Sequence, residues 1–181
     1  MKPSSANSKQ DRDEEAGKTR LWAPWRMKYI EAAAQTGESG CFLCENPKQE
    51  DGPENLVLLR GRLCFVIMNL YPYNNGHLMI APYRHVGDFQ EVTLEEMAEA
   101  GQLTKKCIKA LDDTMHPHGY NIGLNLGRVA GAGVADHLHL HIVPRWSGDT
   151  NFMPVIADTK VVSESLAESW KRLRDAFETK K

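Results

Sequence analysis

The sequence predicts an α+β fold in which an antiparallel sheet of about five strands carries a long helix and a C-terminal helix on one face. Three observations predict it. Short apolar runs separated by turn residues follow one another through the middle of the chain. One long amphipathic segment interrupts them between residues 93 and 114, and a second helical pattern begins near residue 161. A length of 181 residues suits one domain with a single core.

The N-terminal part is expected to begin with a disordered leader. Residues 1–20 are rich in charged side chains and lack aromatic ones, a composition that does not bury a core. Residues 21–181 are therefore predicted to form the single domain. Aromatic residues gather in Leu21–Ile30, which indicates a segment docked on the body, and a short helix is expected from about Met27 to Ala34.

The first three strands are predicted from apolar runs bounded by turn residues. Leu56–Arg60 and Leu63–Met68 flank a short turn and read as a hairpin. Asn69–Gly76 contains proline, asparagine and glycine, so a loop is expected there. His77–Ala81 is the third strand, and Pro82 is expected to stop it.

The long helix has the clearest sequence pattern. Thr93 and Glu96 have the spacing of a capping box, so the helix is expected to begin at Thr93 and to reach about Thr114. Its apolar residues recur at helical spacing; they are Leu94, Met97, Ala100, Leu103, Cys107, Ile108 and Leu111. A fourth strand is expected at Tyr120–Leu126, and the last helix from Val161 to about Phe177.

The segment Asp136–Ile142 places three histidines at period two with apolar residues between them. In a β-strand, alternate side chains point to opposite faces. His137, His139 and His141 are therefore expected to share one face of a strand that Pro144 closes. Imidazole titrates near neutral pH, so such a row suits nucleophilic, acid–base or metal chemistry.

A glycine-rich loop leads into this histidine segment. Gly131-Ala132-Gly133 can turn its backbone N–H groups toward an anion, since glycine has no Cβ in the way. A phosphate held there is expected to lie near His139, whose ring nitrogen can attack phosphorus and form a phosphoramidate. The alternative is a plain surface loop. Asn69 and His77 likewise have two interpretations: they belong to the binding site, or they are ordinary polar residues at a turn.

Cys41 and Cys44 form a C-x-x-C pair, which is either half of a zinc site or a redox dithiol. The redox interpretation lacks the βαβ context that usually accompanies it. A tetrahedral zinc site needs two more ligands, and the chain has no second C-x-x-C. Histidines must then complete the site, and His85 and His137 are the candidates.

Composition excludes several classes of protein. A net charge of −2 provides no basic field for nucleic acid, and no apolar run is long enough for a membrane helix. The N-terminus lacks a signal-peptide core. Four cysteines without a secretion signal favour a reducing compartment, so a cytoplasmic protein is expected. Cys64 and Cys107 lie in apolar patterns and are expected in the core.

The segment His137–Val143 resembles the His-φ-His-φ-His-φ-φ signature of the histidine triad superfamily, where φ is apolar. Further segments similar to that family occur in the same order over about residues 40–145; they are Phe65–Leu70, Gly76–Pro82, Arg84-His85 and Gly123–Asn125. The flanks Leu21–Ile30 and Pro144–Val155 resemble its bacterial diadenosine-tetraphosphate phosphorylase-like branch. The resemblance implies a histidine triad fold with this core and a C-terminal helical extension.

The resemblance also implies a role for each matching residue. His139 would be the nucleophile, His141 would contact the same phosphate, and His77 would support them from the adjacent strand. Nucleotide-binding residues would hold phosphate, ribose and base; they are Asn125, Gly131, Ala132, Gly133 and Val134 for phosphate, Asn69 for ribose, and Ile67, Leu70 and Leu78 for the base. In zinc-containing members the matching ligands are Cys41, Cys44, His85 and His137, so a structural zinc and no organic cofactor are implied.

The implied activity is a nucleotidyl transferase or hydrolase for adenine dinucleoside polyphosphates, most readily by phosphorolysis, in a homodimer or higher homo-oligomer. Val134 stands where phosphoramidate hydrolases of the family carry a serine, which disfavours amine leaving groups. Three alternatives stay open: a purine-nucleoside phosphoramidate hydrolase, a nucleotide-binding regulatory module, and a metallohydrolase with zinc in the triad. The acceptor, phosphate or water, is not fixed by the sequence.

Overall fold

The structure is a computed structural model that describes residues 40–149 and 164–178. The predicted leader, the helix expected at Met27–Ala34, the aromatic segment Leu21–Ile30 and residues 150–163 lie outside the described residues.

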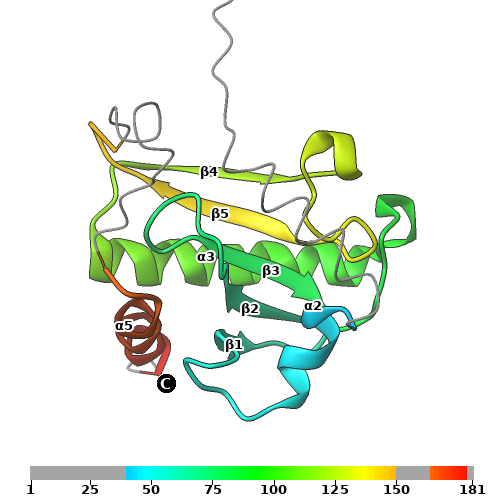
Figure 1. The fold of residues 1–181 in the computed structure, drawn as a ribbon, viewed down its shortest axis with the longest axis horizontal. Coiled ribbons are helices and arrows are strands. Elements are labelled where there is room, and N and C mark those ends of the chain that lie inside the picture. The colour runs from blue at the N-terminus through cyan, green and yellow to red at the C-terminus, as the bar shows by residue number, and fades with distance from the viewer. Residues whose placement is uncertain (1–39, 150–163, 179–181) are drawn as a thin grey trace, which may run out of the picture.

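One five-stranded antiparallel sheet forms the body, which confirms the α+β prediction. The strands lie in the order β1-β2-β3-β5-β4, so the last strand lies between the third and the fourth. Figure 1 shows α3 crossing one face of this sheet and α5 beside β1. The bounds are Val57–Arg60 for β1, Cys64–Met68 for β2, Leu78–Pro82 for β3, Gly119–Leu124 for β4 and Leu140–Arg145 for β5.

The centre of the sheet supplies most of the core. Every residue of β2 and β3 is buried, and the two strands pair from Cys64 with Pro82 to Met68 with Leu78. Strands covered on both faces read as continuous apolar runs rather than alternating ones. This explains why Leu63–Met68 was recognisable as a strand although its side chains do not alternate between apolar and polar.

Helix α3 spans Leu94–Met115 and begins with the predicted capping box. The main-chain N–H of Glu96 donates to the Thr93 hydroxyl at 3.1 Å, and the Glu96 carboxylate accepts from the Thr93 N–H at 2.8 Å. The helix is fixed to the β1–β2 turn by Glu99, whose carboxylate accepts three main-chain N–H groups, from Arg62, Leu63 and Cys64. That contact holds one end of the helix against the sheet.

Helix α5 spans Leu166–Glu178 and covers the free edge of β1. The indole N–H of Trp170 donates to the Val57 carbonyl at 3.0 Å, and the Arg174 guanidinium donates to the Leu58 carbonyl at 2.8 Å. A break in the β1–β2 register between Val57 and Leu59 turns both carbonyls toward the helix. The expected start at Val161 differs from the observed one because Ser165 and Glu168 form the polar cap at the helix N-terminus.

Four short elements complete the described fold. They are the helix α2 (Phe42–Glu45) and the 3₁₀ turns η3 (Asn46–Lys48), η4 (Phe89–Glu91) and η5 (Arg128–Ala130). None was predicted, because single turns carry no periodic pattern. No helix among the described residues combines the length and the apolar composition that crossing a membrane requires.

The prediction that all three triad histidines lie in one strand was wrong. Strand β5 begins at Leu140, so only His141 belongs to it. The preceding backbone bonds elsewhere, since the N–H of Leu138 donates to the Val86 carbonyl in a neighbouring loop at 2.8 Å. Residues 137 and 139 therefore lead into the strand rather than forming it.

Pro144 does not close β5 but lies inside it, opposite Tyr120 of β4. Its carbonyl accepts a hydrogen bond from Asn74 in the loop before β3. In a β-strand, the carbonyl and the nitrogen of one residue point to the same side of the strand. The nitrogen of Pro144 therefore also faces the loop before β3. Because β3 pairs with β5 only as far as Leu78 opposite Ile142, the missing N–H of Pro144 breaks no ladder hydrogen bond.

Candidate active site

His139 is buried, and its ring is hydrogen-bonded to the main chain two residues earlier. Its Nδ1 lies 2.9 Å from the carbonyl oxygen of His137. A carbonyl only accepts hydrogen bonds, so Nδ1 carries the proton and Nε2 keeps its lone pair. Burial lowers the pKa of His139 below its ordinary value, against a smaller opposing effect of the bond to His137. The net lowering of the pKa favours the neutral imidazole, and the bond to the His137 carbonyl leaves the lone pair on Nε2.

His141 lies beside it in β5 and is coupled to His77, the residue before β3. The rings of His139 and His141 meet edge to face with centroids 4.8 Å apart. Nδ1 of His141 lies 2.9 Å from Nε2 of His77, and both residues are buried. The three histidines thus form one contiguous group.

The loop between β2 and β3 packs on this group through Tyr73. The Tyr73 ring lies 4.7 Å from the ring of His77 and 5.7 Å from that of His141, measured between centroids. Its main-chain N–H donates to Nδ1 of His77 at 3.0 Å, and the Asn69 amide nitrogen lies 3.3 Å from the same atom. No motif marks Tyr73 as a site residue, because its contacts depend on the folded path of the loop. The aromatic loop Leu70–Tyr73 beside His77 was the available hint.

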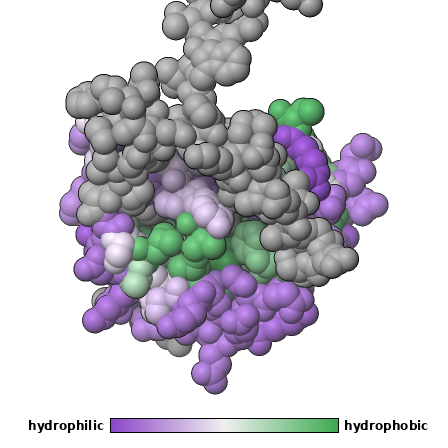
Figure 2. Space-filling model, viewed as in Figure 1, coloured by the Kyte–Doolittle hydropathy of each residue, from purple (hydrophilic) through white to green (hydrophobic). Residues whose placement is uncertain are grey.

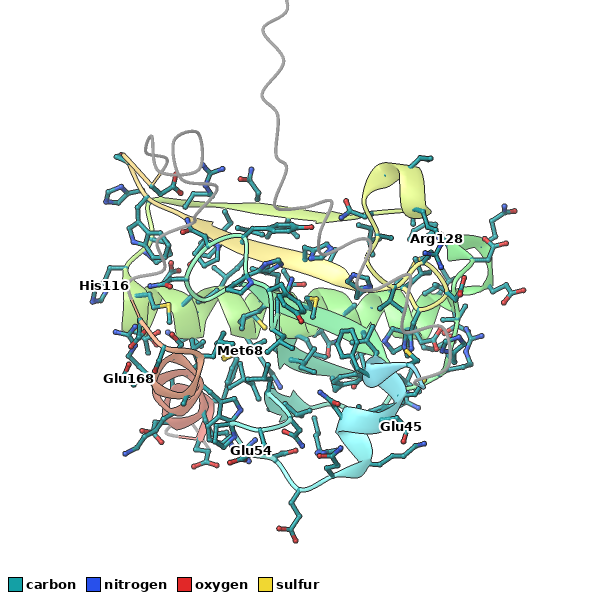
Figure 3. The ribbon with its side chains drawn as sticks, viewed as in Figure 1. Glu45, Glu54, Met68, His116, Arg128 and Glu168 are labelled. Atoms are coloured by element: carbon teal, nitrogen blue, oxygen red, sulfur yellow. The ribbon has the colours of Figure 1, made fainter. Side chains whose placement is uncertain are left out.

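Asn125 connects the glycine-rich loop to the histidines. Its amide nitrogen lies 3.4 Å from Nε2 of His141 and 3.5 Å from the carbonyl oxygen of Gly131. In Figure 3 the loop residue Arg128 and His116, at the end of α3, mark opposite ends of the molecule. The loop therefore lies at the end of the sheet where the histidine segment enters β5.

The four predicted phosphate-binding residues of this loop differ in their main-chain hydrogen bonds. The N–H of Gly131 donates to the Arg128 carbonyl, and that of Ala132 to the Gly127 carbonyl. Within the described parts of the chain, no acceptor binds the N–H of Gly133 or Val134. Those two donors are the ones left to meet an anion.

The expected base-binding residues separate onto two faces. Ile67 of β2 lies opposite Met79 of β3, on the face that also carries His77 and His141. The prediction for Leu78 was wrong, because its side chain points the other way, toward α3, and is fully buried in the core. Leu70 is exposed at the start of the loop. Figure 2 shows apolar residues gathered at the centre of this view of the molecule, with hydrophilic residues along its border.

Cys41, Cys44, His85 and His137 come together, with one ligand atom of each within 4.8 Å of the others. Nδ1 of His137 lies 3.2 Å from the Cys41 sulfur and 3.4 Å from the Cys44 sulfur, and Nδ1 of His85 lies 3.3 Å from Cys44. Ligand atoms around a tetrahedral zinc are separated by a similar distance, ~3.5 Å. The four residues therefore have the spacing of one mononuclear site.

The protonation of His137 also suits a metal ligand. Its Nε2 lies 2.9 Å from the Pro82 carbonyl and must donate to it, so the lone pair is on Nδ1, facing the two sulfurs. Burial and then the neighbouring Cys41 raise the pKa of the Cys44 thiol. A cation between the sulfurs would reverse that effect, since it favours the thiolate. The donor set of two thiols and two imidazoles fits zinc.

A cavity of about 280 Å³ lies on the other face of the sheet, between α3 and the ends of β4 and β5. Its wall is largely apolar and includes Met97, Leu124 and Leu138, while His139 forms part of its margin. The expected core positions Cys64 and Cys107 are buried, and their thiol pKa values are raised to about 12 by burial first. Both are therefore inert core residues.

Comparisons with known proteins agree with this geometry. The family model of the HIT domain matches residues 52–148. The chain is 42% identical to AP-4-A phosphorylase of Mycobacterium tuberculosis, over 83% of this chain and 80% of that protein.

Two solved structures have the same fold. A hypothetical histidine triad nucleotide-binding protein from Sulfolobus tokodaii matches with a TM-score of 0.62 and 25% identity, over 77% of this chain and 93% of that one. A Zn-bound histidine triad family protein from Mycobacterium smegmatis matches with a TM-score of 0.60 and 23% identity, over 76% and 92%.

Proposed function

Because the chain belongs to the HIT domain family, we propose that it is a nucleotidyl-transferring enzyme that cleaves adenine dinucleoside polyphosphates by phosphorolysis. The relative that is 42% identical over most of the chain bears the name AP-4-A phosphorylase, which supports this substrate and this reaction. The observation that carries the proposal is the hydrogen bond from Nδ1 of His139 to the His137 carbonyl, which leaves Nε2 with its lone pair.

The reaction divides into two displacements at His139. The Nε2 lone pair forms a bond to the α-phosphorus, the bond from phosphorus to the bridging oxygen breaks, and its electron pair leaves with the nucleoside polyphosphate. An oxygen of inorganic phosphate then attacks the same phosphorus. The phosphorus–nitrogen bond breaks, its electron pair returns to Nε2, and a nucleoside diphosphate is released.

The remaining site residues stabilise charge on the phosphoryl oxygens. Fixed N–H donors aimed at developing negative charge contribute strongly to such reactions. We assign this role to the amide of Asn125, to the free main-chain N–H groups of Gly133 and Val134, and to His141. Gly131 and Ala132 shape the loop through their internal bonds. Ile67, Asn69 and Leu70 are proposed to contact the nucleoside.

Zinc is proposed for the cluster of Cys41, Cys44, His85 and His137. The name of the M. smegmatis protein of the same fold records bound zinc, which supports this choice. When bound, the ion supplies no chemistry to the phosphate, because four protein ligands fill a tetrahedral shell. Its role would be to fix α2 and the segment before β5 to each other.

A homodimer is proposed through β4, an edge strand that pairs only with β5 among the described residues. Edge strands expose N–H and C=O groups that can pair with a second copy. Apolar side chains on β4 and on the start of α3 are exposed, and such groups mark interaction sites; they are Ile122 (45%), Leu124 (37%), Leu94 (80%) and Met97 (36%). The apolar cavity opens between these two elements, so a second copy has space to insert side chains.

We also propose that residues 21–181 act as one domain and that the protein is cytoplasmic. All four cysteines are free thiols, a state that the reducing cytoplasm maintains.

Product analysis with labelled inorganic phosphate tests the proposed function. Incubation of the protein with diadenosine tetraphosphate and ³²P-phosphate is expected to place the label in ADP. Unlabelled AMP means hydrolysis and overturns phosphorolysis. Faster turnover of an adenosine phosphoramidate than of the dinucleotide overturns the proposed substrate.

A further inference from the structure

We propose that Tyr73 is a positioning residue of this site: it fixes which nitrogen of His77 carries the proton, and through His77 it fixes the proton of His141. The catalytic consequence rests on the proposed function, whereas the proton positions follow from hydrogen bonds alone. Tyr73 lies in the loop between β2 and β3 and is not one of the residues implied by the histidine triad motif.

The first step concerns His77. Its Nδ1 accepts the main-chain N–H of Tyr73 at 3.0 Å. A main-chain N–H only donates, so Nδ1 of His77 is unprotonated. A neutral imidazole carries one proton, which must then be on Nε2. The amide nitrogen of Asn69, 3.3 Å from the same Nδ1, reinforces this tautomer as a second donor.

The second step transfers this constraint to His141. Nε2–H of His77 donates to Nδ1 of His141 at 2.9 Å. Since that Nδ1 accepts, the proton of His141 is on its Nε2. The amide nitrogen of Asn125 lies 3.4 Å from this Nε2 and donates to the Gly131 carbonyl, so both groups are donors and can converge on one acceptor such as a phosphoryl oxygen. His141 therefore presents a hydrogen-bond donor beside His139.

The Tyr73 ring holds this arrangement in place. It lies over both imidazoles, at an angle of 38° to His77 and 28° to His141. Both histidines are buried. Tyr73 is 39% exposed, so its ring covers the imidazoles at the surface of the site, where it reduces the access of water and strengthens the hydrogen bonds beneath it. Because the same residue supplies the ring and the N–H, seating the ring places the donor at Nδ1 of His77.

The loop that carries Tyr73 is itself anchored to β5 and α3. The amide nitrogen of Asn74 donates to the Pro144 carbonyl at 3.1 Å and to the Asp149 carboxylate at 2.8 Å. Gly76 returns the chain to His77 with a φ of +67°, and a Cβ there would lie 2.6 Å from the sulfur of Met115. Both anchors follow Tyr73 in the chain, so the path from Tyr73 to His77 is fixed.

The tautomer matters because a phosphoryl oxygen only accepts hydrogen bonds. In the tautomer set by Tyr73, His141 offers it an N–H. In the reversed tautomer, Nε2 of His141 would offer a lone pair, which repels the same oxygen. Loss of a single donor of this kind lowers turnover by about 100-fold in other enzymes.

The test uses ¹⁵N-histidine NMR of the full chain together with steady-state kinetics on diadenosine tetraphosphate. The ¹⁵N shifts of a neutral imidazole show directly which nitrogen carries the proton. Tyr73→Ala removes the ring, Tyr73→Phe keeps it, and Tyr71→Ala removes the exposed neighbouring tyrosine as a matched control. If Tyr73→Ala does not fold, Tyr73→Leu replaces it.

In the wild type, both His77 and His141 are expected to be protonated at Nε2. Tyr73→Ala is expected to mix the tautomers and to lower kcat at least about tenfold with KM nearly unchanged, while Tyr73→Phe and Tyr71→Ala retain both properties. Unchanged tautomers in Tyr73→Ala overturn the proposal. A rise in KM alone also overturns it, because Tyr73 would then contact substrate. A wild type without dinucleotide turnover refutes the proposed function, and the NMR comparison still decides the tautomers.

Discussion

The carbonyl oxygen of His137 accepts the hydrogen bond of His139 Nδ1 at 2.9 Å, while the ring of His137 faces the sulfurs of Cys41 and Cys44. One residue therefore belongs to the proposed zinc cluster through its ring and supports the proposed nucleophile through its carbonyl. His137 can serve both sites because its side chain and its main-chain carbonyl point in different directions.

Replacing His139 tests its role as nucleophile. His139→Ala is expected to reduce turnover of diadenosine tetraphosphate by more than about 1,000-fold, because no other group forms the covalent intermediate. The circular dichroism spectrum should stay that of the wild type. His118→Ala, which removes a histidine bonded to Ser147 away from the site, is the control and should retain activity. Residual activity of a few per cent in His139→Ala is incompatible with the assignment.

Replacing one ligand tests the proposed zinc site of Cys41, Cys44, His85 and His137. The purified protein is expected to hold about one zinc per chain, and Cys41→Ser to lose it together with several degrees of Tm, because bound metal stabilises the folded state. Elemental analysis and thermal unfolding measure both quantities. Cys107→Ala is the control: it removes a core thiol and should lower Tm without changing zinc content. Zinc retained in Cys41→Ser contradicts the site.

Acid stability should report the ion pair of Asp149 with Arg145. Their hydrogen bond lowers the pKa of Asp149 from 3.8 to about 2. A carboxyl whose pKa is lower in the folded state stabilises the fold above its unfolded pKa. That contribution is present above pH 3.8 and is lost as the pH falls toward 2. Asp149→Asn should flatten the fall of unfolding free energy in this window, measured by urea denaturation, and an unchanged slope would count against the pair.

The proposed dimer can be broken at its edge strand. Leu124→Asp places a charge between β4 and the apolar cavity beside α3, so it is expected to convert the dimer into a monomer. Light scattering after size-exclusion chromatography measures the mass. Val129→Asp alters a fully exposed residue in η5 and should leave the mass unchanged. A wild type that elutes as a monomer at micromolar concentration disproves the dimer.

Glu99 should matter for stability rather than activity. Its carboxylate accepts three main-chain N–H groups, from Arg62, Leu63 and Cys64. Burial alone would raise the pKa of Glu99, but these donors lower it. Glu99→Gln is expected to reduce the unfolding free energy by about 1–3 kcal/mol, since an amide nitrogen cannot accept. Denaturant titration measures this, and the exposed Glu95→Gln serves as the control.

The sequence was informative wherever the pattern is local. Thr93 and Glu96 gave the start of α3 because a capping box involves only neighbouring residues. The turn residues around β1, β2 and β3 separated those strands correctly. The grouping of Cys41 with His137 came from ligand chemistry, and the structure brings those residues together.

Features that depend on distant partners were not predictable. His137 and His139 lie outside β5 because Leu138 bonds to Val86, more than fifty positions earlier in the chain, and nothing near residue 138 signals that partner. The resemblance implied that Leu78 lines the base pocket, whereas its neighbour Met79 faces that side. A fully buried strand shows no apolar–polar alternation that could reveal the difference. The contacts of Tyr73 with His77 likewise require the path of a loop.

The side chains of α5 have a consequence for assembly. Trp170 and Arg174 occupy the outward carbonyls of β1, so within the described residues this edge of the sheet is closed to further pairing, while β4 stays open. A sheet with one usable edge can join another copy only once. In the proposed dimer the two β4 edges would pair with each other, leaving no unpaired strand edge among the described residues from which a filament could grow.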